Sequence, residues 1–145
     1  MKRVHVAAAV IRDGSGKILI ARRADTQHQG GLWEFPGGKV EANESVTTAL
    51  GRELHEELGI VVDVARPLIK VRHDYPDKQV LLDVWEVSAF TGEPHGAEGQ
   101  PLEWVAARDL LNYEFPAANQ PIVAAARLPS QYLICLLYTS PSPRD

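Results

Sequence analysis

The pattern of apolar and polar residues predicts a β-rich domain with two helices. Short apolar runs rich in valine, isoleucine or aromatic residues predict six strands, at 4–11, 17–22, 32–35, 61–71, 79–90 and 102–105. The first two are expected to form a hairpin, because Asp13-Gly14-Ser15-Gly16 between them is a turn sequence. The segments 73–77 and 91–100 are expected to be a hairpin turn and a loop.

The segment that follows Pro36-Gly37-Gly38 has helical periodicity. Counted at 100° per residue, one side of this helix holds Val46, Ala49, Leu50, Leu54 and Leu58. Asn43 is a candidate N-cap, and Gly59 is a candidate left-handed C-terminal residue. Gly51 inside the helix costs about 1 kcal/mol relative to alanine, which suggests that another group packs closely against it.

The last part of the chain is expected to complete the domain with helices and then to leave it. Residues 108–112 predict a helical turn, and the alanine-rich residues 122–128 predict a second helix. We interpret 129–145 as a linker followed by a non-native or disordered tail, because CLLYTSPSPRD at its end resembles translated vector or adapter sequence. The expected domain is therefore 1–128. In some relatives the segment LPSQYLI opens a second domain that resembles thiamine phosphate synthase.

Composition narrows the class of protein. The chain has 145 residues, 45% hydrophobic and 23% charged, which fits one globular domain. The net charge of -4, with no run of lysine or arginine, argues against binding a nucleic-acid polymer. A single cysteine, Cys135, suits a reducing compartment. The basic and then apolar start predicts a strand rather than a signal peptide, and no segment is long enough to span a membrane. We expect a cytoplasmic monomer.

The predicted helix also carries a cluster of acids. Glu53 and Glu57 project into its apolar side, with Arg52 and Glu56 at the border and Glu44 in the first turn, where the helix dipole favours an acid. Carboxylates that point toward the protein body are costly when unpaired. The cluster therefore favours a site for a hard divalent cation, which binds oxygen ligands. The alternative is an ordinary charged surface helix with an Arg52–Glu56 ion pair at i,i+4.

Three further residues are candidates for ligand contacts, each with a plainer alternative. Arg23 ends a strand before a polar loop and could bind a ligand or be a solvated cation. Glu98 lies in a glycine-rich loop, where a carboxylate could reach a metal or only be solvated. Asn119 precedes the second helix, where its amide could cap the helix or read a ligand with its paired donor and acceptor.

These residues have the spacing of the Nudix box. Gly38, five residues, Glu44, seven residues and then RELHEELGI at 52–60 resemble it at every fixed position. Outside the box the chain resembles the MutT branch of the Nudix family, which hydrolyses oxidised guanine nucleoside triphosphates. The matching segments are 22–23, 28, 34–39, 92–94, 98–101, 103–104, 115–116 and 118–119.

The resemblance implies a fold and a set of site residues. The fold would be an α/β/α sandwich with a mixed β-sheet and the Nudix loop–helix–loop. Mg²⁺, which Mn²⁺ could replace, would be held by the Gly37 carbonyl, Glu53, Glu56, Glu57 and Glu98. The small-molecule nucleoside triphosphate would contact Arg23, His28, Glu34, Phe35, Pro36, Gly37 and Asn119.

The implied reaction is hydrolysis of 8-oxo-dGTP to the monophosphate and pyrophosphate, which keeps the oxidised base out of DNA. Such a reaction needs neutralised phosphate oxygens, an activated water and a stabilised leaving group. We expect Glu53 to be the general base, with Glu98 as the alternative, and Arg52 to orient the glutamates.

Two other functions remain open from the sequence. The chain could be a Nudix hydrolase for another nucleotide, such as a cytidine or pterin triphosphate. It could also be a non-catalytic module that recognises a nucleotide or a DNA lesion. The intact Glu53, Glu56 and Glu57 and the negative net charge argue against the second.

Overall fold

The computed structural model describes residues 2–23 and 31–128. His28 and the predicted linker and tail at 129–145 lie outside these residues. The described elements are the six predicted strands, a further short strand at the glycine turn, two α-helices and two short 3-10 helices.

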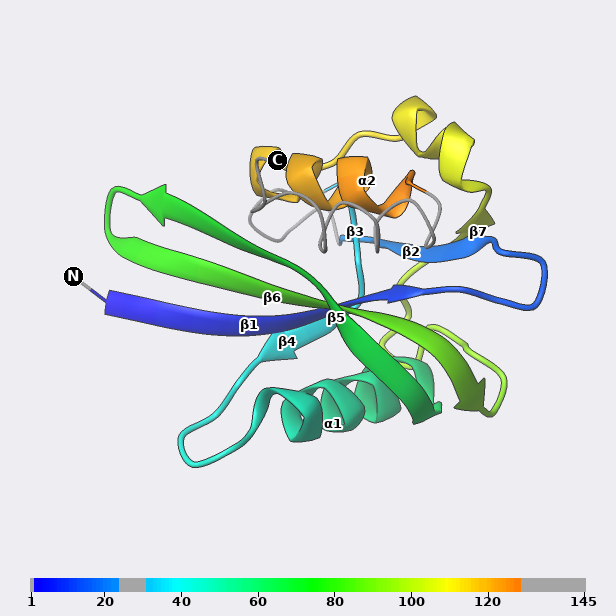
Figure 1. Ribbon diagram of the computed structural model, residues 1–145, viewed down its shortest axis with the longest axis horizontal. Helices are drawn as coiled ribbons and strands as arrows, with labels where there is room; N and C mark the ends of the chain where they lie inside the picture. The colour runs from blue at the N-terminus through cyan, green and yellow to red at the C-terminus, as the bar shows by residue number, and fades with distance from the viewer. Residues whose placement is uncertain (1, 24–30, 129–145) are drawn as a thin grey trace, which may run out of the picture.

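A four-stranded mixed sheet forms the centre of the domain (Figure 1). Strand β1 (Lys2–Ile11) runs parallel to β6 (Lys78–Thr91) along its whole length. The other edge of β1 pairs antiparallel with β4 (Gly37–Lys39), and β6 pairs antiparallel with β5 (Val61–Tyr75). The resulting order is β4-β1-β6-β5.

A smaller antiparallel sheet lies beside the first. Its order is β3 (Trp33–Glu34), β2 (Ile18–Arg22), β7 (Leu102–Val105). The predicted hairpin between the first two strands is wrong, because β4 and β6 already occupy both edges of β1. The turn leaves a single bridge between Arg12 and Ile18, and β2 then enters the second sheet.

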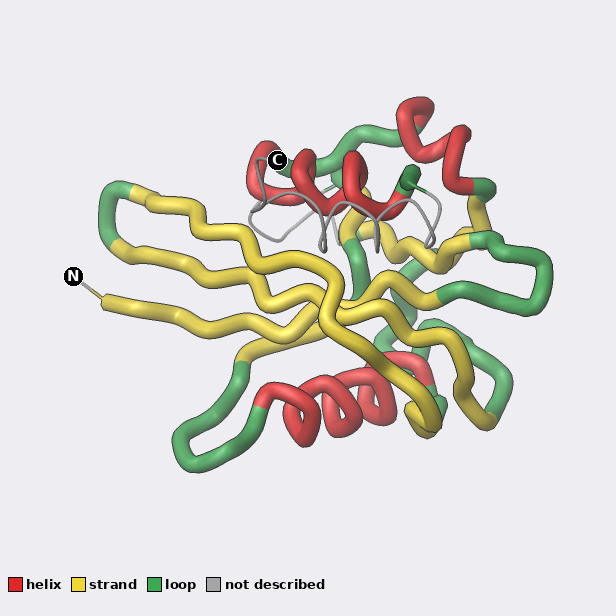
Figure 2. Tube along the Cα trace, viewed as in Figure 1, coloured by secondary structure: helices red, strands yellow, loops and turns green. Residues whose placement is uncertain are grey.

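Helices cover opposite sides of the strands. Helix α1 (Val46–Leu58) lies on one side and α2 (Gln120–Ala126) on the other, as Figures 1 and 2 show from the same direction. The 3-10 helices η1 (Ala107–Asn112) and η2 (Ala117–Asn119) precede α2. The arrangement is the predicted α/β/α sandwich around a mixed sheet.

Alternate residues of β1 enter two separate cores, as the period of two in a strand requires. Ala7 and Ala9 join the α1 side with the buried residues of that helix, which are Ala49, Leu50, Leu54 and Leu58. Ala8 and Val10 join the α2 side. The apolar side predicted for the helix is thus confirmed, and it holds the acidic helix firmly on the central strand.

The ends of α1 differ partly from the prediction. Ser45, not Asn43, is the N-cap, and its side chain accepts a hydrogen bond from Thr48 N at 3.1 Å. Asn43 instead has a left-handed backbone, with φ of 65°. Gly59 ends the helix at φ 73°, as predicted. The close neighbour expected for Gly51 is absent from the described part of the chain, since nothing lies within 4 Å of a Cβ placed there.

The hairpin between β5 and β6 is tighter than predicted. Strand β5 continues to Tyr75, so only Pro76 and Asp77 form the turn that was expected to span 73–77. None of the helices in the described ranges is long and apolar enough to cross a membrane.

Candidate active site

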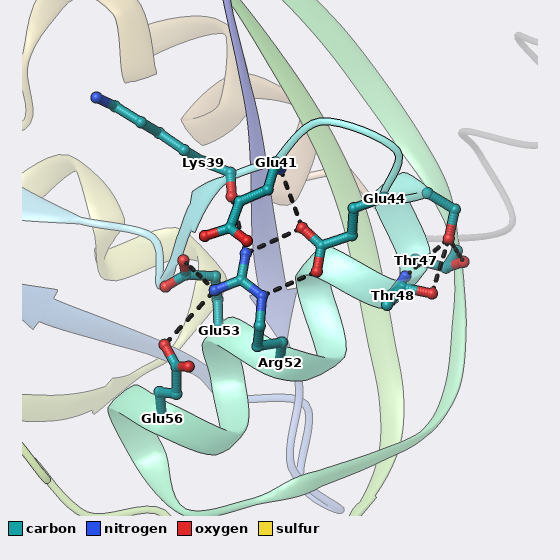
Figure 3. A network of polar contacts seen from close by, with 9 residues as sticks. Lys39, Glu41, Glu44, Thr47, Thr48, Arg52, Glu53 and Glu56 are labelled. Atoms are coloured by element: carbon teal, nitrogen blue, oxygen red, sulfur yellow. Dashed lines mark hydrogen bonds and ion pairs between the residues drawn. The ribbon is translucent and has the colours of Figure 1, made fainter.

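Arg52 is the centre of a network that connects α1 with the loop before it (Figure 3). Its Nε and Nη2 donate to the two carboxylate oxygens of Glu44, at 2.8 and 3.0 Å. Its Nη1 donates to Glu53 Oε2 at 3.0 Å, and Nη2 also donates to the Lys39 carbonyl at 3.0 Å. Glu56 lies further away, with its Oε1 3.6 Å from Nη1.

The network fixes the loop that enters the helix. Hydrogen bonds from Arg52 and from the backbone N–H of Glu41 lower the pKa of Glu44 to about 2. Glu44 is therefore charged near pH 7, and its carboxylate keeps the Arg52 guanidinium in place. Arg52 also contacts Glu53, so the role expected for it, to orient the glutamates, stays a prediction.

Both inward glutamates end at the glycines of β4. A Cβ atom at Gly38 would overlap the Glu53 carboxylate, so only glycine leaves room for it. Glu57 Oε1 accepts a hydrogen bond from Gly37 N at 3.3 Å. The two carboxylates lie on one side of α1, one turn apart, and face the same strand.

Glu57 is a carboxyl group in an unfavourable place for a negative charge. Burial raises its pKa to about 8, and the nearby charges of Glu53, Glu34 and Glu98 add to this effect. The hydrogen bond from Gly37 N offsets it only in part. A cation beside Glu57 would remove the repulsion.

The donors around Glu57 are all oxygens, which fits a hard divalent cation. The described residues do not, however, hold three or more acidic, histidine or cysteine side chains in an arrangement ready to bind a metal. Glu53 is turned to Arg52, Glu57 to Gly37, and Glu56 and Glu98 are exposed. Of the five predicted metal ligands, Gly37, Glu57 and Glu98 line one cavity. Glu53 and Glu56 do not line it, and both lie next to Arg52.

That cavity is polar and has a volume of about 310 Å³. Besides the three residues above, it is lined by arginines and by the loop that bears Glu98, including Arg22, Arg23, Glu34, Gly99 and Gln100. A space that combines carboxylates with guanidinium groups can receive a polyphosphate, because arginine binds phosphate oxygens in a bidentate manner.

A second cavity of about 300 Å³ lies next to it and is largely apolar. Its walls come from β1, from the hairpin end of β5 and β6, and from the start of α2, and they include Val6, Phe35, Tyr75, Lys78, Val80 and Asn119. Phe35 stacks on Phe115 with ring centroids 5.2 Å apart, which makes one wall rigid. Apolar walls with few polar groups are typical of sites for flat organic ligands.

Asn119 is the polar group of this cavity that could read a base. Its side chain makes no capping hydrogen bond to α2, although it is at the N-cap position. The sequence left two roles open for Asn119, helix capping and ligand reading, and the structure does not show the capping role. The amide remains available to the cavity, where its donor and acceptor lie side by side.

The two cavities share Arg23, Glu34 and Gly37. Arg23 Nη1 contacts Glu34 Oε1 at 2.5 Å, so Arg23 is not simply a solvated cation at the end of a strand. Burial raises the pKa of Glu34, and the charge of Arg23 offsets this only in part. The ion pair thus lies between the apolar and the polar space.

The structure also adds residues that the sequence reasoning did not select. Arg22, Gln100, Tyr75 and Lys78 line the cavities but lie outside the box. Arg22 and Gln100 could have been selected from sequence, because Arg22 is adjacent to Arg23 and Gln100 lies two residues after Glu98. Tyr75 and Lys78 flank the hairpin turn, and only the pairing of β1 with β6 brings them to the site.

Comparison with known proteins agrees with the geometry. The model of the NUDIX domain matches residues 7–125. The chain belongs to the Nudix family. It is 40% identical over 124 residues to an 8-oxo-dGTP diphosphatase of Escherichia coli, covering 86% of this chain and 96% of that protein. It is also 40% identical over 125 residues to a CTP pyrophosphohydrolase of E. coli, covering 86% of this chain and 92% of that one.

A solved structure leads to the same family. It comes from a study of MutT from Aliivibrio salmonicida and Vibrio cholerae, is 44% identical and superimposes with a TM-score of 0.77, covering 87% of this chain and 98% of the other. Three predictions are therefore confirmed: the chain is a Nudix family member, it is a Nudix pyrophosphohydrolase, and it has the α/β/α sandwich fold. Nudix hydrolases generally use a divalent metal ion, in keeping with the oxygen donors around Glu57.

Proposed function

We propose that this Nudix enzyme hydrolyses 8-oxo-dGTP and related oxidised guanine nucleoside triphosphates, with Mg²⁺, to the monophosphate and pyrophosphate. The observation that carries the proposal is the junction of two cavities at Arg23, Glu34 and Gly37. One is apolar and contains the amide of Asn119, which does not cap α2, and the other is polar and contains carboxylates and arginines. A nucleotide has the same division, with a flat base at one end and charged phosphates at the other.

In this proposal the polar cavity holds the triphosphate and the metal. Magnesium, when bound, supplies positive charge for the phosphate oxygens and lowers the pKa of water. The metal-holding groups are the Gly37 carbonyl, Glu53, Glu56, Glu57 and Glu98. Arg23 neutralises phosphate charge next to its partner Glu34.

Glu53 is the proposed general base, with Glu98 as the alternative. Arg52 holds one oxygen of Glu53 at 3.0 Å and so fixes the direction in which the other oxygen faces. A base held in one orientation accepts a proton more efficiently than one that must first be ordered. Glu98 is exposed on a loop and has no such support from Arg52.

The base of the nucleotide is proposed to lie in the apolar cavity, with Asn119 at its edge. A guanine presents a donor and an acceptor side by side, and an amide matches both. A base with a different pattern leaves the amide unpaired, which lowers its transition-state binding. The preference for the oxidised base is supported by likeness to the 8-oxo-dGTP diphosphatase.

The runner-up substrate is a cytidine triphosphate. A CTP pyrophosphohydrolase is as similar to this chain as the 8-oxo-dGTP diphosphatase, at 40% identity. The decisive experiment compares kcat/KM for 8-oxo-dGTP, dGTP, CTP and 5-methyl-dCTP with Mg²⁺, and analyses the products. We expect 8-oxo-dGTP to have the highest value and to release pyrophosphate. A higher value for a cytidine nucleotide would show that the substrate is wrong.

The metal site has its own test. Glu57→Gln removes the carboxylate but keeps its size, and we expect kcat/KM to fall by more than the roughly 10–100-fold typical of a residue outside the metal shell. Glu103→Gln, at an exposed position of β7, is the matched control and is expected to keep normal activity. Near-normal Mg²⁺-dependent hydrolysis by Glu57→Gln would contradict the metal assignment.

A further inference from the structure

The loop between β6 and β7 is fastened to the C-terminal end of α1. His95 N donates to the Leu58 carbonyl at 3.1 Å, and Ala97 N donates to the Glu57 carbonyl at 3.0 Å. The last carbonyls of a helix have no partner within the helix, so the loop supplies one. The loop that carries Glu98 is therefore attached to the helix that carries Glu53 and Glu57.

Gln100 adds a side-chain link to this attachment. Its Nε2 donates to the Glu57 carbonyl at 3.1 Å, and its Oε1 accepts from Glu98 N at 3.0 Å. One amide thus connects the backbones of two proposed metal-holding residues. Exchanging its nitrogen and oxygen would break both hydrogen bonds, so the contacts fix the orientation of the amide.

Glu98 needs such support more than the glutamates of the helix do. It is exposed and lies between Gly96 and Gly99 in a loop, whereas Glu53 and Glu57 are held by α1. Gln100 is half-buried and lines the polar cavity with Glu57 and Glu98. Removal of its amide would free the backbone of Glu98 and leave its place relative to Glu57 to the single bond from Ala97 N to the Glu57 carbonyl.

We propose that Gln100 is a positioning residue that sets the place of Glu98 relative to Glu57. It acts through Glu98 and need not touch the substrate or the metal. The inference rests on the proposed function, in which Glu98 and Glu57 serve the same metal-dependent reaction.

The test uses Gln100→Met, which keeps the size of the side chain and removes its amide. We expect kcat/KM for 8-oxo-dGTP to fall about 10–100-fold, as for outer partners of metal ligands, and Mn²⁺ binding, measured by electron paramagnetic resonance, to weaken about 10-fold. Thr91→Val is the matched control, since it removes a hydrogen bond at the start of the same loop, from Thr91 Oγ1 to Asp63 Oδ2. This control is expected to change neither quantity.

A double variant separates positioning from general support of the fold. If Gln100 acts through Glu98, adding Gln100→Met to Glu98→Gln should lower kcat/KM and Mn²⁺ affinity by less than about 2-fold. An undiminished further loss would overturn the proposal, and so would normal kcat/KM and Mn²⁺ binding of Gln100→Met alone. If Gln100→Met does not fold, Gln100→Asn, one methylene shorter, carries the same expectations.

The outcome also distinguishes this inference from the proposed function. If the wild-type protein hydrolyses none of the triphosphates, the proposed function fails, and the Mn²⁺ titrations of the same variants still decide the role of Gln100. If the wild-type protein binds no Mn²⁺, both fail.

Discussion

Arg52 binds both carboxylate oxygens of Glu44, eight residues earlier in the chain, through its Nε and Nη2 atoms. The same guanidinium donates to Glu53 through Nη1. One planar group thus connects the entry loop of α1 with a glutamate that faces β4. Lysine cannot replace it, because an ammonium group lacks the fixed fork of donors.

Arg52→Lys is therefore expected to impair the reaction more than the fold. We expect kcat/KM for 8-oxo-dGTP to fall about 10–100-fold, mainly through kcat, because Glu53 loses its fixed orientation. The thermal midpoint should change little, because the network is only partly buried. Steady-state kinetics and thermal melts check this, with the exposed Arg108→Lys as control. Unchanged kinetics of Arg52→Lys would contradict the orienting role.

The two glycines of β4 predict different consequences of adding one methyl group. In Gly38→Ala the Cβ meets the end of the Glu53 side chain, which can move away. We expect normal stability and a loss of activity, because Glu53 leaves its place. In Gly37→Ala the Cβ meets the backbone of Ala7 and Ala8 on β1, which cannot move without breaking the pairing of the strands.

Gly37→Ala should therefore lose stability as well as activity, by about 1–3 kcal/mol as for other overpacked sites. Denaturant unfolding and kinetics on both variants distinguish the two cases. Gly14→Ala is the control, because nothing lies within 4 Å of its Cβ position. Equal stability losses for Gly37→Ala and Gly38→Ala would show that the Glu53 side chain is not free to yield.

The acidic helix was predictable because its information is local. The helical period placed Glu53 and Glu57 toward the protein body, and the glycines that they contact, Gly38 and Gly37, lie 15 and 20 residues earlier in the chain. The choice between Asn43 and Ser45 as N-cap was not predictable from residue type, since both side chains can cap. In the structure Ser45 is the N-cap, and Glu44 before it is hydrogen-bonded to Arg52.

The sheet was less predictable because its pairing is not local. The parallel pairing of β1 with β6 joins residues more than seventy positions apart, as in the pair Lys2 and Lys78. A turn sequence predicts where the chain reverses but not which strand finally occupies the edge. The apolar cavity depends on the same pairing, so Tyr75 and Lys78 could not be assigned to the site from sequence.

Glu86 on β6, away from the site, should make the free energy of unfolding depend on pH in the acid range. It is buried and accepts hydrogen bonds from Arg12 and from Arg66. Burial raises its pKa, but the two arginines outweigh burial and lower the pKa below the ordinary value of 4.5. The folded protein therefore binds this proton less tightly than the unfolded chain does. The stabilisation is present above pH 4.5 and is lost as the pH falls through the lowered pKa.

Glu86→Gln should accordingly lower the free energy of unfolding at pH 7 by about 2–3 kcal/mol, since both arginines lose their charged partner. The difference from wild type should shrink as the pH falls below 4.5, because the unfolded chain then takes up a proton on this carboxyl that the folded protein binds only at lower pH. Urea unfolding at pH 7 and at pH 3.5 measures both values, with Glu103→Gln as an exposed control. A difference independent of pH would mean that packing, and not charge, is responsible.

Asn119 gives the sharpest prediction for base selection. Its amide makes no capping bond and lines the apolar cavity, so its removal should affect the nucleotide and not the helix. We expect Asn119→Ala to lower kcat/KM for 8-oxo-dGTP about 10–100-fold, which corresponds to about 1.4–2.8 kcal/mol, and to leave kcat/KM for CTP within about 2-fold. The thermal midpoint should stay within a few degrees.

The control for Asn119 is Asn112→Ala, at the exposed end of η1. It removes the same amide at a distance from both cavities and should leave both substrates unaffected. A parallel loss for 8-oxo-dGTP and CTP in Asn119→Ala would show that the residue shapes the cavity without reading the base. The ratio of the two kcat/KM values is therefore the quantity that decides, because a general loss of folded enzyme cancels in it.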